Sequence, residues 1–165
     1  WNAQMTGLIL ISMPIMQAIV TPQSGKLSDL INPQKLSALG MGLATIAILI
    51  LTTMEDTTSI YVIIIALMIG GVGFGLFSSP NTNTMMSSVP PNETTMASAA
   101  VATMRVIGQT LSIGILTVIF AFVMGNVTIT PSVYPQLSES CHLALICSTI
   151  LGFITILASS SSISN

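Results

Sequence analysis

Charge is what this sequence lacks most. Only 5% of its 165 residues are charged, three basic and five acidic, and residues 57–92 and 106–138 carry no charge at all. A soluble domain carries about 25% charged residues, so a water-exposed surface cannot be built from so few charges. This composition excludes a soluble globular protein and places the long uncharged runs in lipid.

Basic residues are also too few to bind a polyanion. Lys26, Lys35 and Arg105 are the only ones, and the net charge is −2. Neutralising a row of phosphates or binding an anionic membrane surface takes a cluster of lysines and arginines. We therefore expect no nucleic-acid partner.

Metal ligands and catalytic groups are equally scarce. Cys141 and Cys147 are six residues apart in one apolar run, so on a helix they would face different directions and could not easily form a disulfide. His142 lacks the further ligands that a zinc site needs. The sequence has no nucleophile beside a base, no paired intramembrane carboxylates and no phosphate-binding loop. We expect no metal, no cofactor and no enzymatic activity.

Long apolar runs are what the sequence has in abundance, since 52% of its residues are hydrophobic. A helix that crosses a bilayer needs about 20 predominantly apolar residues. Five runs fit this length, at approximately residues 4–20, 36–54, 60–77, 97–124 and 141–158. The sequence predicts an all-α integral membrane protein in which residues 1–165 form one bundle of about five transmembrane helices.

Prolines, glycines and lysines predict the connections and the orientation. Pro22 and Gly25 are expected to end the first helix, and Pro80 the third. Residues 21–35 form the only predicted loop with two lysines, so the positive-inside rule assigns this loop to the cytoplasm. By alternation, residues 81–95 form a second cytoplasmic loop.

Small residues offer surfaces for close helix packing, which drives association in membranes. Gly71 and Gly75 have GxxxG spacing in the third span, and Gly108 lies in the fourth. Static packing and a surface that slides during transport both fit this pattern.

Arg105 is the most informative single residue. If the fourth span enters the hydrocarbon near Ala97, Arg105 lies about 12 Å deep, where half the core is about 15 Å. An isolated guanidinium there costs at least ~2.5–3.5 kcal/mol, so Arg105 would line a water-filled cavity or contact a protein partner. Alternatively, the helix begins at Asn92 and Arg105 snorkels to the interface.

Three further polar residues are candidates for function. Gln109 follows Arg105 by one turn, and Gln17 shares its span with the helix-kinking Pro14, so both amides could bind a substrate or bond between helices. Asp29 follows the first span, where it could cap a neighbouring helix or remain a solvated loop acid.

Two motifs resemble the major facilitator superfamily. The stretch Gly25-Lys-Leu-Ser-Asp29 is similar to the start of its cytoplasmic loop signature, G-x-L-a-D-r-x-G-r-k, and departs from it afterwards. The run GGVGFGLFSSPNT, followed by V-P-x-x-x-x-x-x-A-S and a helix with arginine and glycine, looks like the drug:proton antiporter branch with fourteen spans. The matching residues are Pro80, Asn81, Thr82, Ala97, Ser98, Arg105 and Gly108.

The resemblance implies that the five spans are the last five of a secondary transporter, part of the C-terminal half of a major facilitator fold. Such a protein would export small amphipathic or cationic compounds across the plasma membrane, in a prokaryote, by alternating access driven by the proton gradient. Its partners would be the lipid bilayer and the N-terminal half of the same transporter, which holds most of the coupling acids. Gly25 and Asp29 would belong to a gating contact.

Other functions remain open at this point. The chain could be a non-transporting membrane subunit that packs against a larger complex through its glycine and alanine faces. A channel or membrane-embedded enzyme has less support, because an acidic ring, a filter-like motif and paired catalytic groups are all missing. The first residue is Trp1 and no signal-peptide pattern follows it, so we expect a fragment of a longer protein.

Overall fold

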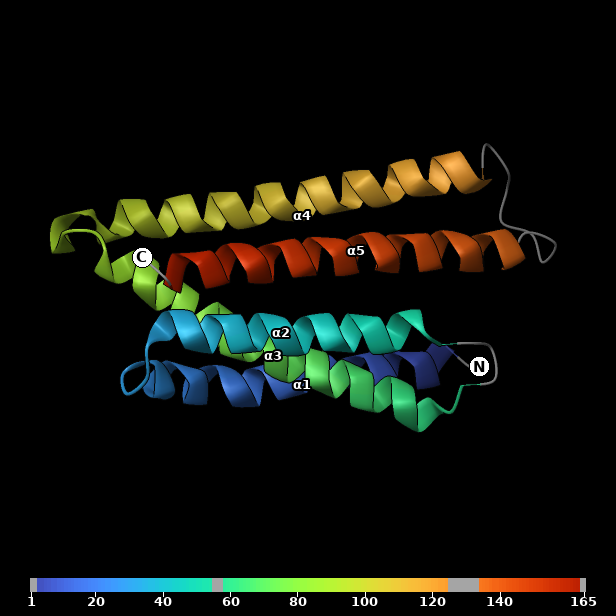
Figure 1. Cartoon of the computed structure of the whole chain (residues 1–165), viewed down its shortest axis with the longest axis horizontal. Coiled ribbons are helices and arrows are strands. Elements are labelled where there is room, and N and C mark those ends of the chain that lie inside the picture. Colours follow the sequence, from blue (N-terminus) through green and yellow to red (C-terminus); the bar gives the residue numbers. More distant parts are fainter. Residues whose placement is uncertain (1–2, 55–57, 125–133, 164–165) are drawn as a thin grey trace.

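The computed structural model describes residues 3–54, 58–124 and 134–163, and it consists of long helices (Figure 1). Each long helix has an apolar stretch of membrane-crossing length. The prediction of an all-α membrane protein with five such helices is therefore confirmed. In chain order the elements are α1 (Ala3–Ser28), α2 (Pro33–Thr52), α3 (Ile60–Ser87), the short 3-10 helix η1 (Pro91–Glu93), α4 (Thr94–Met124) and α5 (Tyr134–Ile163).

Successive helices run in opposite directions along the bundle (Figure 1). The α1–α2 connection, the α3–α4 connection and the C-terminal end of α5 therefore lie at the same end of the molecule. We call this end the lysine end, because Lys26 and Lys35 lie on either side of the α1–α2 connection.

The expected end of the first helix at Pro22 and Gly25 is wrong. α1 continues through both residues to Ser28, and α2 begins at Pro33, so most of the expected loop 21–35 is helical. An internal proline removes one backbone hydrogen bond, whereas ending a helix leaves up to four N–H and four C=O groups without partners. In an apolar surrounding the single loss costs less.

The expected end of the third helix at Pro80 is also wrong. α3 continues to Ser87 and α4 starts at Thr94, so the expected loop 81–95 shrinks to a short connection that contains η1. The carbonyl that Pro80 leaves without a helical donor finds one on α1, as described below. α5 likewise extends beyond residues 141–158 at both ends.

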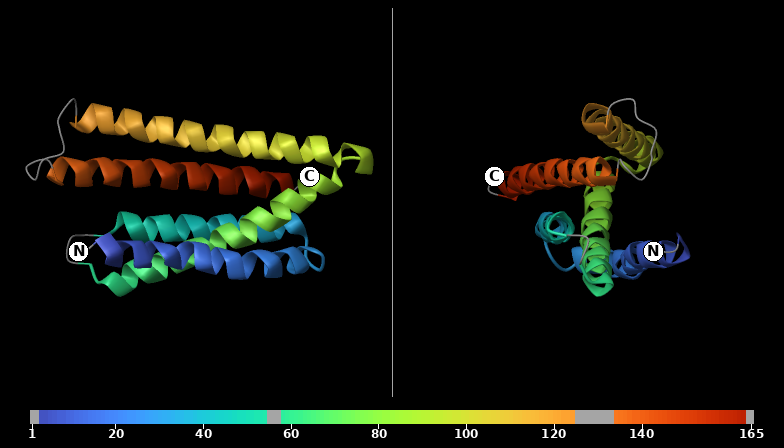
Figure 2. Two further views of the ribbon diagram at one scale, coloured as in Figure 1. Left: turned by 180° about the vertical axis from the view of Figure 1, so that it is seen from behind. Right: turned by 90° about the vertical axis from the view of Figure 1, so that its right-hand side faces the viewer.

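α3 lies between α1 and α2 and packs against both (Figure 2). Gly71 and Gly75 face α1. A Cβ atom added at Gly71 would meet the carbonyl oxygen of Met13, and one at Gly75 would lie 3.0 Å from the Cβ of Val20. The GxxxG pair thus lets the α1 backbone approach α3 closely.

A second pair of glycines forms the α2–α3 crossing. A Cβ atom at Gly40 would lie 2.7 Å from the carbonyl oxygen of Gly73, and one at Gly73 would lie 2.7 Å from the carbonyl oxygen of Gly40 and 2.5 Å from the amide nitrogen of Ala44. Real Cβ atoms do not approach other atoms this closely. The two backbones therefore touch directly at this crossing.

The remaining helices extend the bundle on one side. α5 packs on α2, where a Cβ atom at Gly152 would lie 2.7 Å from the hydroxyl oxygen of the buried Thr45. α4 packs mainly on α5 and lies on the outside of the bundle (Figure 2). No residue in the apolar stretch of α4 is buried, so in the described part of the chain this helix has an uncovered surface along its whole length.

Candidate functional site

A serine on α1 replaces the hydrogen bond that Pro80 removes from α3. Pro80 has no N–H to donate to the carbonyl four residues earlier, that of Leu76. The Ser24 hydroxyl donates to this carbonyl oxygen at 3.2 Å, and both Ser24 and Pro80 are fully buried. Serine side chains commonly satisfy such freed carbonyls in membrane helices. This contact fixes the lysine ends of α1 and α3 to each other.

A polar cleft of about 650 Å³ opens beside this contact, between α1 and α3. We call it the α1–α3 cleft. Gly25 and Asp29, the two predicted gating residues, both line it with Lys26. A Cβ atom at Gly25 would lie 3.1 Å from the hydroxyl oxygen of Ser79, so the glycine allows α3 to approach. The loop signature is thus split between the last turn of α1 and the turn that follows it.

Asp29 does not cap a helix, although capping was one of its two expected roles. Its carboxylate is exposed and has no hydrogen-bond partner among the described residues. Asn32 caps α2 instead, because its side-chain oxygen accepts a hydrogen bond from the Gln34 amide at 3.0 Å. Pro33, between Asn32 and Gln34, is the first residue of α2, a position that suits proline.

A smaller cleft of about 280 Å³, the α3–α4 cleft, contains Arg105. Ser78, Asn81 and Thr82 of α3 supply its other polar side chains. Ser78 and Thr82 also line the α1–α3 cleft, so the two clefts lie on either side of the α3 segment that follows Phe77. This segment is polar and helical, and its helical state was not predicted from the sequence.

The two glutamines are not brought together with Arg105. Gln109 is exposed on α4 and does not line the α3–α4 cleft. Gln17 is half-buried on α1, and its backbone carbonyl oxygen accepts a hydrogen bond from the Thr21 hydroxyl at 2.6 Å. α1 packs on α3, whereas α4 packs mainly on α5 (Figure 2). Gln17 therefore lies at the α1–α3 contact rather than in a cleft shared with Arg105.

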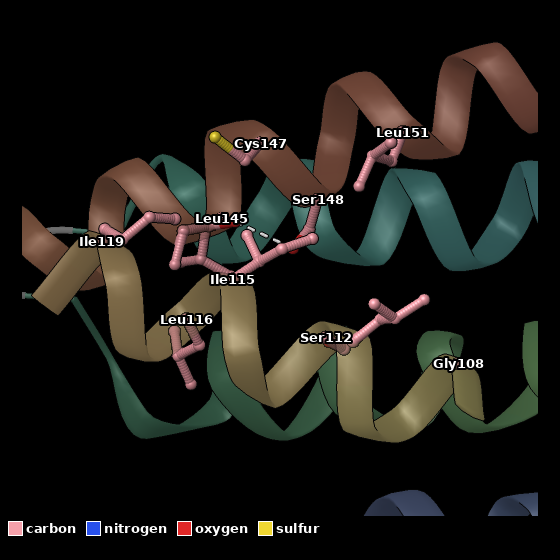
Figure 3. A pocket seen from close by; sticks show the side chains of 11 residues that line it. Gly108, Ser112, Ile115, Leu116, Ile119, Leu145, Cys147, Ser148 and Leu151 are labelled. Atoms are coloured by element: carbon pink, nitrogen blue, oxygen red, sulfur yellow. Dashed lines mark hydrogen bonds between the residues drawn. The ribbon is translucent and has the colours of Figure 1, made fainter. Parts of the chain in front are cut away.

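Gly108 lies in an apolar groove between α4 and α5 instead of a tight helix contact. Nothing lies within 4 Å of a Cβ atom built at this glycine. The groove has a volume of about 450 Å³. Figure 3 shows Ile115 of α4 and Leu145 of α5 pointing toward one another across it, with Ser112 and Ser148 on its two walls. The expected packing role of Gly108 has no counterpart within the described residues.

Sequence reasoning missed the interhelical contacts that Ser24, Gly40 and Gly73 make. Gly40 and Ala44 have small-xxx-small spacing, and Gly73 follows Gly70 by three residues, but neither pair was singled out as a packing face. A buried serine becomes noticeable only once Pro80 is known to lie inside a helix. The described residues contain no group of three or more histidine, cysteine, aspartate or glutamate side chains that could hold a metal ion.

Comparison with known proteins is consistent with this architecture. The chain is 26% identical to the "Riboflavin transporter RibZ" of Clostridioides difficile (strain 630) over 120 residues, which are 73% of this chain and 26% of that protein. It is 32% identical to the "Uncharacterized transporter YebQ" of Escherichia coli (strain K12) over 104 residues, 63% of this chain and 23% of that protein.

A third relative is the "Multidrug resistance protein Stp" of Mycobacterium tuberculosis, which is 28% identical over 121 residues, 73% of this chain and 22% of that protein. The chain thus spans about a quarter of the length of the curated relatives it matches. No solved structure matches it significantly. The sequence profile of the Major Facilitator Superfamily matches residues 1–113. The chain therefore belongs to the Major Facilitator Superfamily.

Proposed function

We propose that this chain forms five helices in the C-terminal half of a proton-coupled exporter of small amphipathic or cationic compounds, in the drug:proton antiporter branch with fourteen spans. The exporter would reside in the plasma membrane of a bacterium, and the chain would work with the N-terminal half of the same polypeptide. Family membership and the bacterial relatives support a transporter. The relative described as a multidrug resistance protein supports export of small compounds.

The position of Arg105 is the observation that carries the proposal. The midpoint of α4 (Thr94–Met124) is Gln109, so Arg105 lies only about 6 Å from it along the axis at 1.5 Å per residue. A guanidinium this close to the middle of a membrane helix is costly in lipid and is found facing a cavity or a partner. Because α4 is uncovered in the described chain, it has a free surface to present to a central cavity.

The polar clefts support alternating access at the lysine end. Membrane transporters of this kind rock two helix bundles around a midplane cavity. Gly25 and Asp29 border the α1–α3 cleft at this end, and Arg105 borders the α3–α4 cleft further along α4. A second bundle that closes on this end would therefore meet polar groups rather than apolar side chains. Gln17 and Gln109 remain candidates for substrate hydrogen bonds.

The proposed activity is tested on the full-length polypeptide that carries this chain. In inside-out vesicles with an acidic lumen, we expect the dyes rhodamine 123 and rhodamine 110 to accumulate, and a protonophore to abolish that accumulation. Vesicles from cells without the protein serve as the control. Equal dye accumulation with and without the protein, or with and without the pH gradient, would contradict proton-coupled export.

The proposed orientation makes a separate prediction at the two ends of α2. In a background with Cys141 and Cys147 replaced by serine, Leu30→Cys should react with a membrane-impermeant maleimide only from the cytoplasmic side. Thr53→Cys, at the other end of α2, should react only from outside. Both sites are exposed, Leu30 at 84%, so access by water and not burial decides the outcome. The reverse labelling pattern would show that the chain has the opposite orientation in the membrane.

A further inference from the structure

The α3–α4 cleft gathers hydrogen-bond donors that have no acceptor. Arg105 carries five N–H groups and Asn81 carries two. Neither side chain forms a hydrogen bond or an ion pair with any residue that the structure describes. The hydroxyl of Thr82 is engaged with its own helix, where it donates to the carbonyl oxygen of Ser78 at 2.9 Å. The Ser78 hydroxyl, which also lines the cleft, forms no hydrogen bond with a described residue either. The open donors therefore belong to Arg105, Asn81 and Ser78.

Arg105 also lacks a counter-charge among the residues that the structure describes. No acidic side chain lines its cleft. Asp29 borders the neighbouring α1–α3 cleft, and Glu93 is exposed in η1. Glu139 lies in the second turn of α5, near the end of the bundle opposite the lysine end (Figure 1). Within the described chain, this half of the transporter presents a positive charge and hydrogen-bond donors where the proposed cavity lies.

We infer that the α3–α4 cleft binds an anionic oxygen group, such as a carboxylate, on the transported compound. The inference rests on the proposed function and narrows its substrate class to amphipathic molecules that carry such a group. A guanidinium matches a carboxylate with two parallel N–H to oxygen bonds, and the Asn81 amide can donate a further bond to the same group. Apolar side chains, Phe77, Met85, Val101 and Met104, line the rest of the cleft and suit the apolar body of the compound.

This assignment uses the geometry of the cleft as well as its charge. A cleft of about 280 Å³ has room for the polar end of a drug-sized molecule but not for all of it, since whole-ligand pockets measure about 300–1,000 Å³. The remainder of the ligand would extend toward the uncovered surface of α4. Arg105 would thus select compounds by one group and leave the rest of their structure free.

The test compares two dyes that differ at one carboxyl group. Rhodamine 110 carries a free carboxylate, and rhodamine 123 is its methyl ester. Transport of both is measured with the full-length protein in inside-out vesicles with an acidic lumen. In Arg105→Ala we expect the rate for rhodamine 110, divided by that for rhodamine 123, to fall about tenfold, because a charge-assisted hydrogen bond is lost. Arg105→Lys should lower the ratio less, since it keeps the charge without the paired donors.

Two further variants control the comparison. Asn81→Ala should lower the same ratio severalfold, because a neutral donor is lost. Thr110→Ala should leave it unchanged, since Thr110 is exposed on the same helix outside the cleft and bonds only to the carbonyl of Val106. Protein levels in the membrane are measured for every variant, so that a folding defect is separated from altered selectivity.

Three outcomes would overturn the inference. An equal loss of transport for both dyes in Arg105→Ala would indicate that Arg105 forms an ion pair with an acidic residue of the N-terminal half instead of binding the dye. The proposed function would still stand. Unchanged transport of both dyes in Arg105→Ala would show that the carboxylate binds elsewhere, again without affecting the proposed function. If the wild-type protein moved neither dye under the proton gradient, the inference would fall together with the proposed function.

Discussion

Replacing Gly40 by alanine should destabilise the full-length protein, whereas the same replacement at Gly42 should not. The added Cβ at Gly40 would lie 2.6 Å from the amide nitrogen of Phe77, 2.7 Å from the carbonyl oxygen of Gly73 and 2.9 Å from the carbonyl carbon of Leu76. All three atoms belong to the backbone of α3, which cannot turn away as a flexible side chain can. The helices must therefore separate.

The size of the effect follows from the matched control. Overpacking of this kind costs about 1–3 kcal/mol. Gly42 lies on the same helix with nothing within 4 Å of an added Cβ, so the gain in helix propensity from glycine to alanine, about 1 kcal/mol, is shared by both variants. We expect the melting temperature in detergent to fall for Gly40→Ala and to hold or rise for Gly42→Ala. Equal melting temperatures would show that the α2–α3 crossing is not this close.

The second large effect is expected at Ser24. In Ser24→Ala the Leu76 carbonyl, next to the buried Pro80, loses its donor. A buried polar group without a partner costs about 1–3 kcal/mol. In contrast, Ser12→Ala should be nearly neutral. Ser12 donates to the carbonyl of Ile9 within its own helix, and that carbonyl also has the backbone N–H of Met13 as its helical donor, so it keeps a partner when the serine is removed.

A double-mutant cycle separates this mechanism from general loss of packing. Pro80→Ala restores an N–H that can bond to Leu76 within α3. Ser24→Ala should therefore cost at least about 1 kcal/mol less in the Pro80→Ala background than in the wild type, as expected for residues that share one partner. The measurement is again the melting temperature of the full-length protein. Additive effects would mean that the Ser24 hydroxyl does not compensate for the proline.

The helices themselves were predictable, but several of their ends were not. Long apolar runs identify the five segments because each must form its backbone hydrogen bonds internally in lipid. Proline normally ends a helix, so Pro80 predicted a loop. Its cost is offset by Ser24, which is 52 residues away in the sequence. Because the segment after Pro80 was expected to be a loop, the cleft that Asn81 shares with Arg105 could not be foreseen.

Glycines show the same division. The spacing of Gly71 and Gly75 predicted a small helix face, and the structure shows that α1 lies against it. Gly40 and Gly73 form a similarly close crossing. Each has a small residue on the same face, Ala44 four residues after Gly40 and Gly70 three residues before Gly73, but neither pair was singled out from the sequence. Gly108 resembles them in sequence and has open space around it. The residue type permits close approach, while the opposing helix decides whether it occurs.

By itself, the sequence determined that this protein is a set of membrane helices and that Arg105 is an exceptional charge among them. These properties depend on local hydrogen bonds four residues apart and on the cost of charge in lipid, both of which are encoded within each segment. Only the tertiary structure decided that α3 packs between α1 and α2, that Ser24 supplies the bond missing at Pro80, and that Arg105 shares a cleft with Asn81. Such contacts join surfaces from distant segments, and helix association in a membrane depends on how closely those particular surfaces fit.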